Sequence, residues 1–195
     1  MSDVSKKVAQ SLLNINAIKL QPANPFTWAS GWKSPIYCDN RITLSYPEIR
    51  TLIRDEFVNV IKKTYPTVEI IAGVATGAIA QGALVAQSME KPFIYIRSSA
   101  KGHGMENLIE GEIKAGQKVV VVEDLISTGG SSLKAVEALR NADCEVLGMV
   151  AIFTYGFQTA IENFSKANVD LLTLSNYNSL VELALESNYI SDSQF

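Results

Sequence analysis

Residues 119–132, VVVVEDLISTGGSS, combine two carboxylates with a loop rich in hydroxyl groups and glycine. The valine run predicts a buried strand, and Glu123 and Asp124 stand at its end. The loop before the next predicted helix consists of small residues: Ser127, Thr128, Gly129, Gly130 and Ser131. Glycines let main-chain N–H groups turn towards a ligand, and a helix N-terminus adds the positive end of its dipole. The loop is therefore predicted to hold a phosphate monoester.

A second interpretation of this loop stays open on these residues alone. A tight strand-to-helix turn with a serine N-cap needs the same residue types. The Walker A motif is excluded, because no lysine follows the second glycine at the spacing of that motif. The glycine fingerprint of dinucleotide-binding proteins does not match either.

The two acids restrict the ligand further. Carboxylates at the lip of a phosphate site repel the phosphate unless the ligand also brings hydroxyl donors or Mg²⁺. A ribose 5-phosphate offers a phosphate for the loop and a 2′,3′-diol for Glu123 and Asp124. The alternative is a pair of exposed acids that merely ends a strand.

Apolar segments and amphipathic segments alternate along most of the chain. Strands are predicted at residues 69–75, 92–97, 118–124, 145–153 and 169–174, and helices at 77–89, 131–141, 157–166 and 178–186. This alternation predicts an α/β fold, with a mostly parallel sheet flanked by helices. Ligands of such sheets bind beyond the carboxyl ends of the strands.

The N-terminal part follows another pattern. Residues 3–15 have apolar residues at helical spacing, and residues 25–45 are broken by proline and glycine and rich in aromatic residues. We expect a small hood, formed mainly by residues 17–45, beside a core of about 46–186 in one domain spanning 1–195. A helix should begin after SYPE, with Ser45 as its cap, Pro47 in its first turn and Glu48 completing a capping box. Its expected buried face consists of Leu52, Ile53, Phe57, Val60 and Ile61.

A second unusual loop, RSSAKGHGMEN at residues 97–107, carries positive charge among glycine and serine. Arg97, Lys101 and His103, the one histidine of the chain, suit a diphosphate. With few apolar side chains to anchor it, the loop is predicted to be mobile. The alternative is a solvated loop with basic residues that have no role.

Composition excludes some broad classes of protein. The chain has 195 residues, 47% of them hydrophobic, and a net charge of −3, which argues against a general nucleic-acid or membrane-surface binder. Cys38 and Cys144 form no CxxC pair, so neither a zinc site nor a disulfide framework is indicated. Without a signal-like segment or a long apolar run, a soluble cytoplasmic protein is expected.

Four segments together make the chain similar to a known family. VVVVEDLISTGGSS resembles the phosphoribosyl-diphosphate motif of type I phosphoribosyltransferases. FTWASGWKSPIYCDNR at 26–41 looks like the N-terminal signature of the orotate phosphoribosyltransferases, and RSSAKGHGMEN resembles their mobile catalytic loop. With IFTYGF at 152–157, the resemblance spans nearly the whole chain. It implies transfer of a 5-phosphoribosyl group from its 1-diphosphate to orotate, giving orotidine 5′-phosphate in the synthesis of UMP.

The resemblance also implies roles for individual residues. Catalytic roles are expected for Lys101, His103, Glu123 and Asp124. Donor binding is expected of the same four residues together with Arg97, Leu125, Ile126, Ser127, Thr128, Gly129, Gly130 and Ser131. Orotate is expected to contact Ser127, Tyr37 and Arg41, with main-chain N–H groups of residues 30–33. The alternative for Tyr37 and its aromatic neighbours is that they pack the hood itself. Mg²⁺ is implied as the cofactor, held through the substrate and water near Glu123 and Asp124 without a direct protein ligand. A homodimer is implied, in which the 97–107 loop serves the neighbouring subunit's site.

The sequence departs from the family pattern in places. Several members have lysine where this chain has Ala29, Gly77 and Ser98, and IFTYGF has no clear equivalent of the arginine that contacts orotate in some members. Two rival functions follow: a phosphoribosyltransferase for another base, or a regulator that only senses phosphoribosyl diphosphate. The 26–41 segment disfavours the first, and the basic loop and the acidic net charge disfavour the second.

Overall fold

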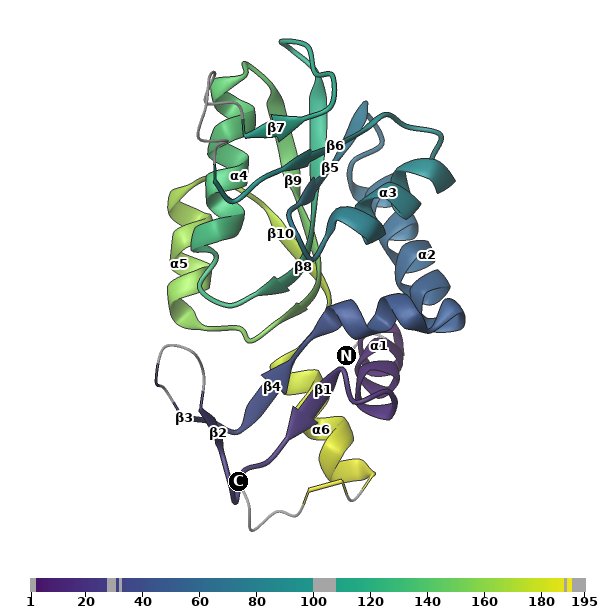
Figure 1. Cartoon of the computed structure of the whole chain (residues 1–195), viewed down its shortest axis with the longest axis vertical. Helices are drawn as coiled ribbons and strands as arrows, with labels where there is room; N and C mark the ends of the chain where they lie inside the picture. Colours follow the sequence, from purple (N-terminus) through teal and green to yellow (C-terminus); the bar gives the residue numbers. More distant parts are fainter. Residues whose placement is uncertain (1–2, 28–30, 32, 100–107, 188, 191–195) are drawn as a thin grey trace.

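A six-stranded sheet forms the centre of the chain. The computed structural model describes residues 3–27, 31, 33–99, 108–187 and 189–190 (Figure 1). Its sheet runs in the order β10-β9-β8-β5-β6-β7. The strands are β5 (Ile70–Val74), β6 (Phe93–Ile96), β7 (Ile109–Glu110), β8 (Lys118–Ile126), β9 (Glu145–Thr154) and β10 (Leu171–Asn176). All neighbours pair in parallel except the edge strand β7, so the predicted mostly parallel sheet is confirmed.

Helices cover both faces of the sheet, as its apolar strands require. On one face lie α2 (Pro47–Thr64) and α3 (Ile79–Ser88), and on the other α4 (Gly130–Asn141) and α5 (Gln158–Lys166) (Figure 1). The valines of β8 alternate between these layers: Val120 and Val122 join the core under α2 and α3, while Val119 and Val121 join the core under α4 and α5. Both faces being buried explains why this strand is an unbroken valine run rather than an alternation of polar and apolar residues.

The hood lies beyond the carboxyl ends of the strands (Figure 1). It contains two antiparallel pairs, β1 (Ile18–Leu20) with β4 (Ile36–Cys38) and β2 (Phe26–Thr27) with β3 (Lys33–Ser34). A 3-10 helix, η1 (Asn40–Ser45), leads from the hood into α2. The helices α1 (Asp3–Asn14) and α6 (Tyr177–Glu186) pack together beside it, joined by the buried bond from Ser5 Oγ to Ser179 Oγ at 2.8 Å.

The predicted core elements are found within two residues of their expected bounds. The prediction for the start of α2 was wrong about its N-cap. Its N-cap is Tyr46, without a side-chain hydrogen bond, rather than Ser45. Ser45 is the last residue of η1, and Tyr46 N–H donates to Thr43 O to close that 3-10 turn, so the serine is not placed to cap α2. Pro47 occupies the first turn as predicted. Ile53, Phe57 and Ile61 are buried as expected, whereas Leu52 and Val60 are only partly buried.

Among the described residues, no helix combines the length and apolar character that crossing a bilayer demands.

Candidate active site

The acidic pair lies where β8 extends beyond the end of its neighbour β5. Pairing of β5 with β8 ends at Gly73 opposite Val122, whereas pairing of β8 with β9 continues to Ile126 opposite Thr154. Glu123 and Asp124 therefore follow the last residue of β8 that pairs with β5. They lie at the carboxyl end of the sheet, where ligands of parallel sheets bind.

Glu123 is buried and held by protein donors. Its side chain is 5% exposed, Oε2 accepts from Ser132 Oγ at 2.8 Å, and Oε1 accepts from the Asp124 N–H at 2.9 Å. Burial, followed by the adjoining Asp124 carboxyl group, raises the pKa of Glu123 to about 8. The alternative of two exposed acids is therefore wrong for Glu123, which is set into the wall of the site.

Asp124 is the more accessible acid of the pair. It is partly buried, and its carboxylate lies directly against Gly77 in the loop after β5. A Cβ atom on residue 77 would overlap that carboxylate, so only glycine leaves Asp124 in this place. This contact gives a physical reason for the absence of lysine at position 77.

The loop after β8 has the geometry of an anion cradle. Gly129 has φ +81°, a left-handed conformation that favours glycine, and it is the N-cap of α4 without any side-chain cap. The alternative of a serine N-cap is therefore wrong. Thr128, Gly130 and Ser131 are exposed, Ser127 is partly buried, and the first N–H groups of α4 point out of its N-terminus. Asn163 of α5 donates to the Thr128 carbonyl at 3.0 Å and ties the loop to the sheet's flank.

Arg97 lies near the cradle, on the far side of a cavity. The cavity measures about 430 Å³ and lies between the ends of β5 and β6 and one side of α4, from Ser131 to Asn141. Arg97, Ser98 and Lys134 also contribute to its lining. Arg97 Nη1 lies 3.5 Å from Glu110 Oε1 of β7. The structure thus brings Arg97 and the phosphate loop to one cavity and adds Lys134, which the sequence reasoning missed.

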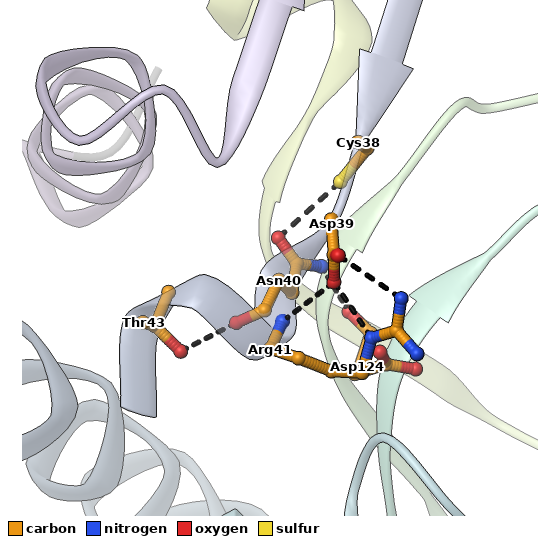
Figure 2. Close-up of polar contacts among 6 residues, drawn as sticks. All are labelled: Cys38, Asp39, Asn40, Arg41, Thr43 and Asp124. Carbon is orange, nitrogen blue, oxygen red and sulfur yellow. Dashed lines mark hydrogen bonds and ion pairs between the residues drawn. The ribbon is translucent and has the colours of Figure 1, made fainter. Parts of the chain in front are cut away.

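The residues expected to contact orotate are less closely grouped. Tyr37 is 42% exposed and packs its ring on Phe26, with centroids 5.8 Å apart. The Arg41 guanidinium donates two hydrogen bonds to the Asp39 carboxylate, from Nε to Oδ1 at 2.7 Å and from Nη2 to Oδ2 at 3.0 Å (Figure 2). Arg41 holds the pKa of Asp39 below its ordinary value. A smaller cavity of about 200 Å³ in the hood is lined by other residues: Ser34, Pro35, Ile36, Tyr155, Phe157 and Tyr177.

Lys101 and His103 lie outside the described residues, as do Ala29 and residues 30 and 32 of the expected orotate contact. Two further polar residues around the acids escaped the sequence reasoning. Ser132 is the last residue of the 119–132 segment, and its hydroxyl group was the one signal in the sequence that it could hydrogen-bond to a carboxylate. Asn40 gave none, because its partner, Asp124, is 84 residues away.

Comparison with known proteins identifies the family. The phosphoribosyl transferase domain matches residues 41–188. A protein of Porphyromonas gingivalis called orotate phosphoribosyltransferase is 64% identical over 98% of this chain and 91% of its own length. The chain belongs to the orotate phosphoribosyltransferase family.

Solved structures agree with the membership of this orotate phosphoribosyltransferase family. The crystal structure of orotate phosphoribosyltransferase from Aeropyrum pernix superposes with a TM-score of 0.81 at 27% identity, over 94% of this chain and 99% of that one. The UMP synthase of Leishmania donovani also gives a TM-score of 0.81, at 31% identity, over 97% of this chain and 40% of that longer protein. The predicted type I phosphoribosyltransferase fold and the predicted family are thus confirmed.

Proposed function

We propose that this chain transfers a 5-phosphoribosyl group from 5-phospho-α-D-ribose 1-diphosphate to N1 of orotate, releasing diphosphate and orotidine 5′-phosphate, in the route to UMP. The observation that carries the proposal is the meeting of Glu123 and Asp124 with the glycine loop at one end of the sheet. A sugar that carries both a diol and a phosphate matches this arrangement, with the diol at the acidic pair and the phosphate at the glycine loop.

The loop is proposed to bind the 5′-phosphate of the donor. Main-chain N–H groups around Gly129, Gly130 and Ser131, with the hydroxyls of Ser127 and Thr128, supply donors at the N-terminus of α4. Leu125 and Ile126 lead from the acids into the loop, and their pairing with β9 sets its position. The open, exposed surface of the loop supports direct access for the ligand.

The acidic pair is proposed to hold the ribose and to favour charge that develops on it. Breaking the bond at C1 gives the sugar oxocarbenium character, which a nearby carboxylate stabilises. Asp124 is the accessible acid and takes the diol, whereas Glu123 acts from the wall beside it. Orotate needs no strong base, because its N1 proton can leave before the chemical step, so positioning and neutralisation of the leaving group dominate.

The diphosphate is proposed to be bound by Arg97, Lys101 and His103. Arg97 lies beside the cavity that the phosphate loop also borders, which supports a leaving group between them. Lys101 offsets charge on the departing diphosphate, His103 donates a hydrogen bond to it, and closure of the 97–107 loop excludes water. We further propose a cytoplasmic homodimer in which this loop serves the neighbouring subunit.

Mg²⁺ fits the chemistry of the acidic pair. Among the described residues, no group of three or more acidic, histidine or cysteine side chains could hold a metal ion by itself. Mg²⁺ commonly keeps several waters and binds phosphate oxygens of a substrate, so it would be held near the acidic pair through the donor and water. When bound to donor and water near Glu123 and Asp124, the ion supplies charge neutralisation for the diphosphate.

Orotate is proposed to bind between the hood and the loop, with Ser127 at the base and the sugar, Tyr37 against the ring and Arg41 near its carboxylate. Arg41 is already paired with Asp39, so the aspartate must share the guanidinium with the ligand. The exposure of Tyr37 supports a ring surface that is open to a planar partner.

A comparison of four acceptors tests the function. Orotate, uracil, adenine and hypoxanthine are offered with the donor and Mg²⁺, and released diphosphate is measured. We expect turnover with orotate and little with the others. Turnover with a purine or uracil instead would replace the proposed acceptor, and no turnover with any base, together with binding to RNA or DNA at moderate salt, would favour the regulator.

A further inference from the structure

A buried asparagine joins the hood to the acidic strand. Asn40, the first residue of η1, is 2% exposed. Its side-chain Nδ2 donates to the main-chain carbonyl of Asp124 at 2.6 Å, and its Oδ1 accepts from Cys38 Sγ at 3.3 Å (Figure 2). Both ends of the amide are therefore used, one towards the hood and one towards the site.

The contact falls where β8 has lost a neighbour. Beyond Val122 the strand no longer pairs with β5, and it is held by β9 alone, through Glu123 opposite Ala151 and Leu125 opposite Phe153. Asp124 lies between these two pairs. A short hydrogen bond from a buried donor therefore restrains the main chain of Asp124 where the sheet restrains it least.

Asn40 is itself firmly placed. Thr43 Oγ1 donates to the Asn40 carbonyl at 2.6 Å within η1, and the preceding Asp39 accepts from the N–H of Arg41 at 3.2 Å as the cap of that helix (Figure 2). The donor that reaches Asp124 thus comes from a capped turn rather than from a free side chain.

We propose that Asn40 is a positioning residue, which sets the Asp124 carboxylate for the sugar and couples it to the hood that covers the base. The proposal rests on the function proposed above. It differs from a merely structural role, in which Asn40 would stabilise the hood without acting through Asp124.

The test compares two buried hydrogen bonds in the same short helix. Asn40→Asp keeps the size of the side chain but removes the donor to Asp124, whereas Thr43→Val removes the donor to the Asn40 carbonyl and leaves the amide in place. For Asn40→Asp we expect kcat/KM for the donor to fall roughly tenfold or more, with the KM for orotate close to wild type. For Thr43→Val we expect a lower melting temperature with kcat/KM close to wild type.

A double-mutant cycle decides whether Asn40 acts through Asp124. In an Asp124→Asn background, Asn40→Asp should cause little further loss, because the group it positions has already changed. Full additivity of the two losses, or equal losses from Asn40→Asp and Thr43→Val, would overturn the proposal. Cys38→Ala, which frees only the far end of the amide, provides a milder variant, with a smaller loss that is also non-additive with Asp124→Asn.

Calorimetric titration with the donor and Mg²⁺ separates the two proposals. The titration needs no acceptor nucleobase, so it measures the coupling of Asn40 and Asp124 even if orotate is not the acceptor. Wild-type protein that binds the donor but does not turn over orotate would refute the proposed acceptor alone. Equal donor affinity in wild type and Asn40→Asp, with kcat also unchanged, would refute the role of Asn40 alone.

Discussion

The hydroxyl of Ser132 donates a 2.8 Å hydrogen bond to Oε2 of Glu123, and both side chains are buried. The first turn of α4 therefore does two things: its N-terminus faces the expected phosphate, and the second serine of the turn holds a carboxylate at the end of β8. The phosphate site and the acidic pair are thereby tied to each other by one hydrogen bond.

Ser132→Ala should shift the pH dependence of turnover. The pKa of Glu123 is raised to about 8 chiefly by burial and by Asp124, while the bond from Ser132 opposes this rise. Without that hydrogen bond the pKa of Glu123 rises further. If ionised Glu123 supports catalysis, the rising limb of the kcat profile should therefore move to higher pH. Ser131→Ala, in the exposed part of the loop, should raise the KM for the donor and leave the limb in place.

Glu123 should also make the fold less stable as the pH rises from about 4.5 to about 8. Its pKa in the folded chain, about 8, lies above the ordinary value of 4.5, so folding favours the protonated form. This stabilisation is complete below pH ~4.5 and is lost as the pH rises through about 8. Glu123→Gln stays neutral, so its melting temperature relative to wild type should increase across this window, by the equivalent of a few kcal/mol (~1.4 per pKa unit). Cys38 does not affect this comparison, because both proteins contain it and the ordinary pKa of its thiol, 9.0, lies above this window. A difference that stays constant with pH would contradict the raised pKa.

Gly77→Ala should displace the Asp124 carboxylate while the aspartate itself stays in the sequence. The new Cβ would overlap the Asp124 carboxylate, which must then turn away. We expect kcat/KM for the donor to fall by about tenfold to a hundredfold, the scale of one lost charged hydrogen bond. Gly116→Ala is the control: its φ of +82° disfavours alanine, but no atom lies within 4 Å of the added Cβ and the turn precedes β8 at its far end. It should lose about 1–2 kcal/mol of stability and keep its kcat. Equal kinetics for both variants would argue against the position of Asp124.

The strands of the central sheet could be predicted from the sequence, because each is indicated by the residue pattern of its own segment. The valine run of β8 and the glycines of the following loop each report on their own neighbourhood, and their order along the chain placed the acids at the strand's end. Even there, the hydrogen bond from Ser132 of α4 to the buried Glu123 could not be foreseen, because it joins a helix to the strand before it. Gly129 is left-handed and lies against Phe164 of α5, so a side chain at this position would be both strained and crowded, and no local pattern reveals the second of these.

The hood was far less readable, because its decisive contacts join distant segments. Asn40 meets Asp124 across 84 residues, and nothing in DNR indicates that the amide points inward while the arginine turns outward. The cap expected at Ser45 failed for a related reason: η1 runs on to that residue, and sequence patterns distinguish a 3-10 turn poorly from the start of an α-helix. Tyr37 and Arg41 consequently keep their orotate roles as proposals.

Gly129→Ala should weaken donor binding by distorting the phosphate loop. Alanine is strained at φ +81°, and its Cβ would lie 2.6 Å from Cε2 of Phe164. We expect the KM for the donor to rise about tenfold, with a smaller effect on the KM for orotate. Adding Phe164→Leu should relieve the contact but not the backbone strain, so the double variant should recover part of the donor affinity. No recovery would assign the whole effect to the backbone.

Lys101→Ala should lower turnover strongly while affecting donor affinity less, because the proposed lysine acts on the departing diphosphate. Unchanged turnover would remove Lys101 from the proposed mechanism. Mixing this variant with Asp124→Asn then tests whether the loop serves the neighbouring subunit. If it does, a hybrid dimer contains one site with both an intact Asp124 and an intact Lys101, and random exchange should restore about a quarter of wild-type activity. If each subunit uses its own loop, every site in the mixture lacks one of the two groups. The mixture should then be no more active than the average of its parents. Size-exclusion chromatography of each variant establishes that it is a dimer, and co-purification of one variant with an affinity-tagged form of the other establishes that subunits exchange.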